Sequence, residues 1–389
     1  MVWQAGNLLF AALRSHGQAG GIRLRTVLVL GGYGFFGHRI CASLASDTSI
    51  RLLVAGRHLD RALQTARHLG LGTDQALLLD ANHSDFGRLV KASGAEIVIH
   101  TAGPFQQQDY GVARAAIEAG CHYIDLADGR QFVAGISALD DEARKHNVSV
   151  ISGASSVPAL SSAVVDRYQP QFARLESIEL AISSGARAPG LATVQGIFGY
   201  AGRPFHYLSN GEWATAHGWR GLRRHRFPAP LGPRWLCHCD IPDLELFPKR
   251  YPDVSTVSFE AGFASDLGHV VVWTLAGLVK AGALPSASPF AAPLNRLSRW
   301  IEPVVSHRGG MFVQLKGIGH DGKPLRITWN LVAQNNHGPH IPCGAAIALA
   351  QKLCGGGRLP SGAMPCMGLL SVEEYLAALP GLNLTEIVE

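Results

Sequence analysis

The chain has 389 residues, which is the length of two typical domains and excludes a single small one. Charged residues make up 16% and hydrophobic residues 47% of the sequence, so a disordered or solvating protein is also excluded. The net charge of +5 is small for this length, which disfavours non-specific binding to nucleic acid. We therefore expect a small-molecule partner and no nucleic acid.

The cysteine content and the apolar segments indicate in which compartment the protein occurs and whether it crosses a membrane. Seven scattered cysteines are untypical of a secreted disulfide scaffold and favour reduced thiols in the cytoplasm. The longest apolar segment, Leu267 to Val279, is shorter than the roughly 18 residues of a membrane span, and we expect a buried helix there. Residues 1–25 have an apolar patch without a preceding basic residue, so we expect a loose N-terminal extension and not a signal peptide.

The first half of the sequence alternates short apolar runs with segments of helical periodicity. These runs are too continuously apolar for a sheet with one solvent-exposed face. They indicate parallel strands that are covered by helices on both faces of the sheet. We predict an α/β fold, in which residues 26–155 form a doubly wound parallel-sheet Rossmann domain. The six predicted strands are Thr26–Leu30, Ile50–Ala55, Ala76–Asp80, Ala95–His100, His122–Leu126 and Val148–Ser152.

After about Ser156 the periodicity changes to the alternation of half-buried antiparallel strands. It occurs at residues 178–182, 311–315 and 325–331, and the Asp321-Gly322 pair predicts a hairpin between the last two. Residues 156–340 are therefore expected to form an inserted α+β domain for substrate binding and dimerisation. The Pro-, Gly- and Arg-rich stretch from Tyr200 to Tyr251 reads only as an extended loop.

A final helix is predicted from Ile341, with Pro342 in its first turn and Gly355 at its end. Its apolar residues recur at helical spacing and must be buried somewhere.

The strongest functional motif is a glycine-rich loop between the first strand and the next helix, formed by Gly32, Tyr33, Gly34, Phe35, Phe36 and Gly37. In a dinucleotide-binding fold the first glycine permits a tight turn and the second admits the pyrophosphate. The third lets the helix pack on the strand, with its N–H groups facing the phosphates. The alternative is a glycine-rich turn without a ligand.

The end of the second strand indicates which dinucleotide binds. An NAD-preferring fold places an acid there, but this chain has Arg57, which suits the 2′-phosphate of NADP. Alternatively, Arg57 is a surface residue at a helix start. Asp80 ends the third strand, where a carboxylate accepts a hydrogen bond from the adenine amino group or caps the next helix.

Small residues follow the fourth strand at the edge where ligands bind. Ala102, Gly103 and Pro104 are expected to let the backbone approach the second ribose and the nicotinamide. A turn that merely starts the next helix is the alternative.

Taken in order and spacing, four motifs resemble the saccharopine dehydrogenase (reductase) family, and the later part of the chain resembles bacterial members of that superfamily. The resemblance implies an NADP-binding Rossmann domain, an inserted second domain, helices at residues 341–389 that return to the first domain, and often a homodimer. The founding enzymes reduce an imine formed from an amino acid and an aldehyde, or catalyse the reverse. The motifs are Val29–Gly34, Ala55–Arg57, Thr101–Phe105 and Gly120–Leu126.

Asp125 is the candidate catalytic residue, because it ends the fifth strand at the same sheet edge. A buried carboxylate beside a nicotinamide can orient the ring or move a proton to the nascent amine. The alternative is a helix-capping or ion-paired aspartate, with Asp128 and Arg130 just beyond it.

Two polar clusters invite other interpretations. Residues 237–240, with the sequence Cys-His-Cys-Asp, suggest a zinc site. However, adjacent residues of a strand point to opposite faces of the sheet, and the sequence has no second pair of ligands at a suitable spacing. We therefore expect no metal. The basic cluster at residues 219–226 is expected to be a solvated loop, or else to dock substrate carboxylates.

Together these features predict an NADP-dependent oxidoreductase of the saccharopine dehydrogenase type. It would transfer hydride between nicotinamide and a carbonyl or imine carbon of a small, carboxylate-bearing substrate. Two alternatives remain: a non-catalytic NADPH-binding sensor, and an enoyl reductase acting on a lipid-like substrate.

Overall fold

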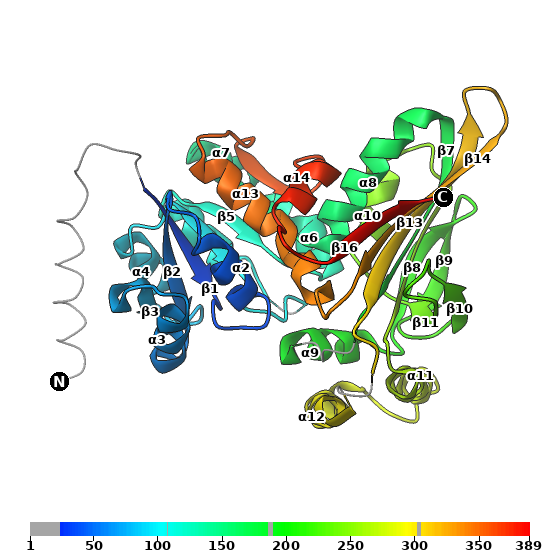
Figure 1. The fold of residues 1–389 in the computed structure, drawn as a ribbon, viewed down its shortest axis with the longest axis horizontal. Coiled ribbons are helices and arrows are strands. Elements are labelled where there is room, and N and C mark those ends of the chain that lie inside the picture. The colour runs from blue at the N-terminus through cyan, green and yellow to red at the C-terminus, as the bar shows by residue number, and fades with distance from the viewer. Residues whose placement is uncertain (1–23, 107, 186–189, 302–304) are drawn as a thin grey trace.

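The computed structural model describes residues 24–106, 108–185, 190–301 and 305–389. These residues form two sheet-centred halves joined side by side (Figure 1). The extension predicted at residues 1–25 lies almost wholly outside the described residues. Within the described ranges, no helix is both long and apolar enough to cross a membrane.

In the described part of the first half, seven strands form a parallel sheet in the order β15-β6-β5-β4-β1-β2-β3. The order from β3 to β6 is that of a Rossmann domain, and all six predicted strands are present. The strands are β1 (Arg25–Leu30), β2 (Ile50–Gly56), β3 (Ala76–Leu78), β4 (Ile97–His100), β5 (His122–Asp125), β6 (Ser149–Ser152) and β15 (Gly362–Pro365).

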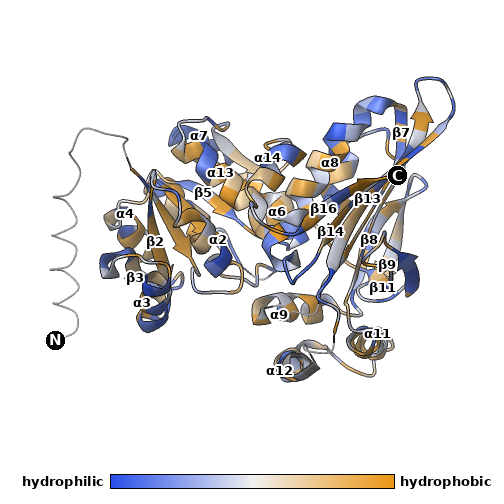
Figure 2. Cartoon of the chain, in the orientation of Figure 1, coloured by the Kyte–Doolittle hydropathy of each residue, from blue (hydrophilic) through white to orange (hydrophobic). Residues whose placement is uncertain are grey.

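Helices cover both faces of this sheet, which explains its continuously apolar strands (Figure 2). Val27 and Val29 of β1 face the side covered by α2, α3 and α13, whereas Leu28 and Leu30 face α4, α5 and α7. The helices of this half are α2 (Gly37–Leu44), α3 (Leu59–His68), α4 (Phe86–Ala92), α5 (Gly111–Glu118), α6 (Arg130–Gly135), α7 (Asp140–Lys145) and α13 (Gly344–Cys354).

The second half is built on a mixed sheet in the order β10-β11-β12-β7-β13-β14-β16. Strand β7 pairs in parallel with β12 and antiparallel with β13, and β13 and β14 form the predicted hairpin. The two sheets confirm the predicted fold class. The strands of the second sheet are β7 (Phe172–Ser183), β10 (Arg223–Arg226), β11 (Pro233–His238), β12 (Thr256–Gly262), β13 (Gly309–Gly319), β14 (Pro324–Ala333) and β16 (Leu384–Val388).

Residues 200–251 are not the extended loop that the sequence suggested. They contain the hairpin β8 (Pro204–Ser209) and β9 (Glu212–His217), the strands β10 and β11, and the helix α10 (Asp243–Arg250). Strand β10, with the sequence Arg-Arg-His-Arg, lies at the edge of the sheet with its arginines exposed. An edge strand needs no continuous apolar run, and therefore the periodicity did not reveal it.

The apolar segment 267–279 is a helix, α11 (Asp266–Lys280), but it is not buried as expected. Leu267 is 67% exposed and Val270 is 47% exposed, because α11 packs on the second half by one face only. The remaining helices of the second half are α8 (Ser161–Tyr168), α9 (Leu191–Tyr200), α12 (Ala291–Ile301) and α14 (Val372–Ala377).

The C-terminal segment also departs from the prediction of helices throughout 341–389. A 3₁₀ turn at Gly338–Cys343 precedes α13, which begins at Gly344 and contacts α2 of the Rossmann domain. Strand β15 extends the parallel sheet, whereas β16 returns to the second sheet and pairs with β14. The last residues thus cover the backbone edge of β14, which would otherwise be unpaired.

Candidate active site

The glycine loop packs more tightly than its sequence alone indicates. The positive φ of +83° falls on Gly31 and not on Gly32, where we expected the tight turn. A Cβ on Gly32 would lie 2.9 Å from a methyl group of Val54, and one on Gly37 would lie 2.2 Å from the Gly31 oxygen. Gly37 therefore lets α2 approach the loop, as predicted for the third glycine.

The N-terminus of α2 offers donors for a phosphate. Its first residue is Gly37, and no side chain caps the turn that Phe36 begins. Amide groups at such a helix end attract anions, because they carry the positive end of the helix dipole. Phe36 also lines the cavity described below, and Phe35 contacts the N-terminus of α9 near Gly190. The loop thus joins the two halves.

Cationic and aromatic side chains gather beyond the carboxyl end of β2. Arg57 is exposed there, and the Arg61 guanidinium lies 4.7 Å from the centre of the Tyr33 ring. The Tyr33 hydroxyl accepts a hydrogen bond from the His58 backbone at 3.0 Å. Arg57 and Arg61 suit an adenosine 2′-phosphate, and Arg61 is a second cation that our sequence reasoning missed. Because Arg61 follows Arg57 by four residues at the start of a helix, the spacing could have indicated that both side chains lie on the same side.

The other predicted cofactor residues occupy the same edge of the sheet. Asp80 accepts the backbone N–H of Asn82 at 3.0 Å, which is a local turn contact and matches the capping alternative more closely than the adenine role. Gly103 and Pro104 line the cavity, whereas Ala102 lies behind it and accepts a hydrogen bond from Gln108 at 2.8 Å.

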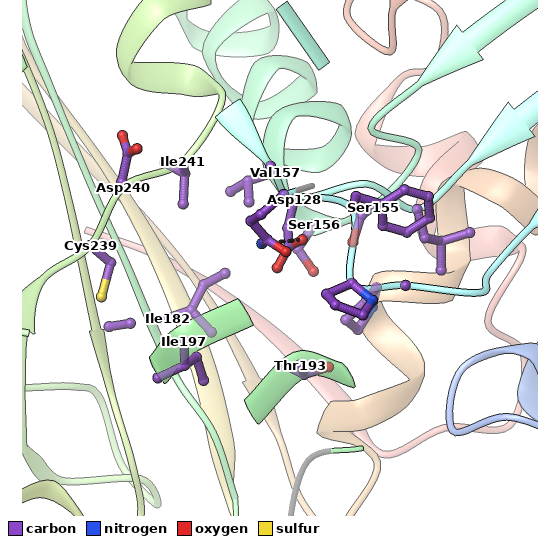
Figure 3. A pocket seen from close by; sticks show the side chains of 18 of the residues that line it. Asp128, Ser155, Ser156, Val157, Ile182, Thr193, Ile197, Cys239, Asp240 and Ile241 are labelled. Carbon is purple, nitrogen blue, oxygen red and sulfur yellow. Dashed lines mark hydrogen bonds between the residues drawn. The ribbon is translucent and has the colours of Figure 1, made fainter. Parts of the chain in front are cut away.

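A cavity of about 330 Å³ lies between the carboxyl ends of the parallel strands and the second sheet (Figure 3). The Rossmann half contributes Thr101, Gly103 and Asp128 to its wall, and the second half contributes Ile182 and Cys239. Most of the lining is apolar. Ligands of doubly wound folds bind at this edge, so the cavity is the candidate site for the nicotinamide and the substrate.

Asp128 presents a carboxylate to this cavity. Its Oδ1 accepts a hydrogen bond from Gln106 Nε2 at 3.0 Å, and Ser155 and Ser156 lie beside it (Figure 3). The Asp128 side chain is exposed to the cavity, whose surrounding protein atoms raise the pKa of its carboxyl group, although the bond from Gln106 opposes this shift. A carboxyl group with a raised pKa that faces a cavity is a candidate proton donor.

Asp125 lies beneath the cavity and is fully buried. Its Oδ1 accepts the backbone N–H groups of Ala127 and Gly153 at 2.9 and 2.8 Å, and the Ser152 hydroxyl at 3.0 Å. Burial raises the pKa of Asp125 to about 6, while these bonds oppose the rise. Asp125 is not among the residues that line the cavity, so the geometry moves the candidate proton donor to Asp128.

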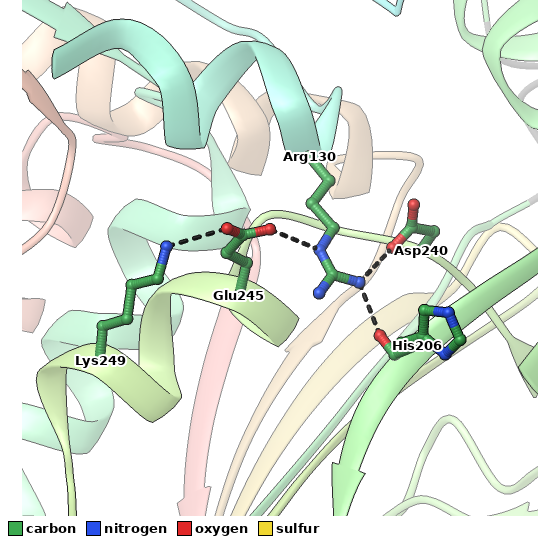
Figure 4. A network of polar contacts seen from close by, with 5 residues as sticks. All are labelled: Arg130, His206, Asp240, Glu245 and Lys249. Atoms are coloured by element: carbon green, nitrogen blue, oxygen red, sulfur yellow. Dashed lines mark hydrogen bonds and ion pairs between the residues drawn. The ribbon is translucent and has the colours of Figure 1, made fainter. Parts of the chain in front are cut away.

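Arg130 connects the two halves at the rim of the cavity (Figure 4). Its guanidinium pairs with Asp240 at 3.0 Å and with Glu245 at 3.3 Å, and it donates to the backbone oxygen of His206 at 2.7 Å. Burial raises the pKa of Asp240, and the Arg130 guanidinium opposes that rise. Arg130 is therefore already engaged by two carboxylates.

The other polar clusters reach the cavity only through Cys239, Asp240 and Trp219. Cys237 Sγ lies 3.2 Å from His269 Nε2; burial raises the pKa of this thiol to about 12 and lowers that of the imidazole to about 4. In the described ranges, no three metal-ligating side chains gather. In the basic cluster, Arg223 pairs with Glu260 and Arg220 stacks on Trp273, away from the cavity.

Comparison with known proteins supports the assignment of the first half. Residues 27–152 match the family model of the saccharopine dehydrogenase NADP binding domain. No curated protein matches the sequence. The structure of saccharopine dehydrogenase (L-Glu forming) from Saccharomyces cerevisiae is similar with a TM-score of 0.66 at 15% identity, covering 94% of this chain and 100% of that chain.

An amine dehydrogenase from Mycobacterium smegmatis is similar with a TM-score of 0.48 at 12% identity, covering 92% of this chain and 97% of that chain. The yeast enzyme shares the fold of nearly the whole chain, and the family model identifies the cofactor of the first half. Residues 27–152 therefore form an NADP-binding domain of the saccharopine dehydrogenase type.

Proposed function

We propose that this protein transfers hydride between NADP and a carbonyl or imine carbon held in the cavity between its two halves. The observation that carries the proposal is the position of Asp128. It lies in the cavity at the carboxyl edge of the parallel sheet, next to the glycine loop and the Gly103-Pro104 backbone. Nicotinamide chemistry occurs at this edge in such folds, and a carboxyl group there supports the proposal.

The nicotinamide, when bound, supplies or accepts the hydride. The chain's own residues would hold it: the N-terminus of α2 would bind the pyrophosphate, and Arg57 and Arg61 would bind the 2′-phosphate. The apolar cavity wall excludes water, which strengthens the electrostatic interactions within the site.

Asp128 gives a proton to the substrate oxygen or nitrogen as the carbon is reduced, and it accepts one in the reverse direction. Desolvation keeps its carboxyl group protonated to a higher pH than usual, and Gln106 fixes its orientation. Tyr200 also lines the cavity, but burial raises its pKa well above the ordinary value and makes it a weaker acid.

The charges of the cavity refine the substrate class. Arg130 is the single cation among the described lining residues, and Asp240 and Glu245 already neutralise it. An unpaired guanidinium is what would bind a substrate carboxylate, so the expected carboxylate-bearing substrate finds no matching partner here. A neutral carbonyl compound or a neutral imine fits the apolar wall and a protonated Asp128 better.

NADPH consumption with aldehydes and ketones, with and without ammonium or primary amines, tests the proposal. With stereospecifically deuterated NADPH, the label should appear on the substrate carbon. Asp128→Asn should lower turnover about 10²-fold or more while NADPH binding stays unchanged. Asp141→Asn on exposed α7 is the matched control. NADPH binding without turnover of any compound would instead indicate a sensor.

We also propose a cytoplasmic homodimer in which residues 156–340 form the substrate and dimerisation domain. The seven cysteines, none of which forms a disulfide among the described residues, suit a reducing compartment. Sedimentation velocity of the full chain tests the dimer, since a monomer at all concentrations excludes it.

A further inference from the structure

A second cavity lies next to the proposed active site and differs from it in character. It has a volume of about 320 Å³ and lies between α9, α11 and α12. Its described lining contains no charged side chain. We refer to it as the helix groove, and its main lining residues are Val194, Phe198, Leu267, Val271, Leu294 and Leu297.

The helix groove adjoins the active-site cavity. Ser184, Ile197 and Phe263 line both spaces, so the two cavities are adjacent and share these residues as a wall. Ile197 of α9 is drawn in Figure 3 among the residues that line the active-site cavity. A ligand that passes these shared side chains from the active site would therefore enter an apolar space.

The outer end of the helix groove is open and hydrophobic. Leu267 and Leu297 line it and are 67% and 60% exposed. Large exposed apolar side chains grouped around a groove mark a binding surface, because leaving them in water is unfavourable. The groove is apolar, it opens to solvent and it shares a wall with the active site. These three features favour an apolar part of the substrate as its ligand.

We propose that the substrate carries a long hydrocarbon tail, which occupies the helix groove while its carbonyl or imine carbon lies beside Asp128. This inference rests on the proposed function, because it places the reacting carbon in the active-site cavity. The uncharged groove supplies affinity for the tail, and the absence of an unpaired cation among the described active-site residues fits a substrate without a carboxylate. Each additional buried methylene should tighten binding about fourfold until the groove is filled.

Gly268 provides a variant that fills the groove. It lies in the first turn of α11 and lines the groove, and a Cβ there would make only ordinary contacts with Ser265, at 3.4 Å or more. Gly268→Leu should therefore fold normally and shorten the longest tail accepted. Thr274→Leu, at an exposed position of the same helix outside the groove, adds the same side chain and is the matched control.

Two measurements test the proposal on the full-length protein. The first is kcat/KM for NADPH-dependent reduction of the straight-chain aldehydes from butanal to dodecanal. The second is calorimetric binding of the 1-alkanols of the same lengths, which needs no turnover. We expect both series to rise about fourfold per methylene and then level off, earlier in Gly268→Leu than in wild type or Thr274→Leu.

The two series separate the tail from the reaction. Turnover that is independent of chain length would overturn the tail proposal and leave the oxidoreductase intact. Chain-length-dependent alkanol binding without any turnover would support the groove and refute the proposed reaction.

Other occupants of the groove predict different results. A dimer that Leu297→Glu separates, with no alkanol binding, would make the groove a subunit interface and overturn the proposal. Sedimentation with phosphatidylcholine vesicles, again without alkanol binding, would make it a membrane contact and also overturn it.

Discussion

The guanidinium of Arg130 lies 3.0 Å from the carboxylate of Asp240, and this ion pair joins the Rossmann half to the second half across the rim of the cavity (Figure 4). Arg130 follows the fifth strand of the parallel sheet, and Asp240 follows β11 of the mixed sheet. Only 12% of the Arg130 side chain is exposed, so the pair is poorly screened by solvent. The contact therefore helps to set the width of the cavity.

Arg130→Met should lower the free energy of unfolding by about 1–3 kcal/mol, since it leaves Asp240 and Glu245 facing each other without a cation. Urea denaturation followed by fluorescence measures the loss. Arg144→Met is the control, because the Arg144–Asp140 pair lies on an exposed helix face and should contribute less than about 0.5 kcal/mol. Equal losses in the two variants would contradict a specific role for Arg130.

The pH dependence of turnover should identify the proton donor. Asp128 must be protonated to donate, so kcat/KM for reduction should fall as the pH rises through its raised pKa. This falling limb should disappear in Asp128→Asn and persist in Asp125→Asn, because the buried Asp125 carboxylate holds two backbone N–H groups and the Ser152 hydroxyl. A limb that vanishes in Asp125→Asn alone would return the proton-donating role to Asp125.

Asp243 should make stability depend on pH. It is fully buried with Ser161 as its hydrogen-bond partner, and burial raises its pKa to about 7. The folded state thus binds this proton more tightly than the unfolded state, so the contribution of Asp243 to stability falls as the pH rises from about 4 to about 7.

Relative to Asp243→Asn, the wild-type free energy of unfolding should decrease across this range by roughly 2–4 kcal/mol. Urea midpoints at several pH values measure the difference. Parallel curves for the two proteins would show that Asp243 does not titrate in this range.

The Rossmann strands were predictable because helices bury the side chains on both of their faces. A strand such as β1, covered by helices on both faces, needs apolar residues throughout, and few other structures produce such short runs. Strands β10 and β16 gave no such signal, because each lies at a sheet edge with mostly exposed side chains. Their positions depend on pairing with distant segments, which periodicity does not report.

The candidate site was predictable only to within a few residues. The sequence indicated that the loop after β5 reaches the active edge, but the choice between Asp125 and Asp128 depends on which carboxylate the turn directs into the cavity. The hydrogen bonds from Ala127 and Gly153 hold Asp125 below the surface, which favours Asp128 in our proposal. Likewise, the sequence of α11 is apolar enough for a helix buried on all sides. Its exposure depends on which other elements pack against it, and the sequence of the helix does not report that.

Cofactor choice should depend on Arg57. Its exposed guanidinium at the end of β2 can form charge-assisted hydrogen bonds with a 2′-phosphate, which contribute roughly 1.5–3 kcal/mol, or about 10- to 150-fold in affinity. NADPH should therefore bind at least tenfold more tightly than NADH. Arg57→Ala should weaken NADPH by most of that factor and leave NADH nearly unchanged.

Fluorescence titration of both cofactors measures the preference, and the effect of Arg57→Ala should shrink at high salt because the contact is partly exposed. Arg61→Ala should produce a smaller loss, since that guanidinium already stacks on Tyr33. Arg67→Ala, in the last turn of α3, is the control for a general change in surface charge. Equal affinities of wild type for NADPH and NADH would refute recognition of the 2′-phosphate by Arg57.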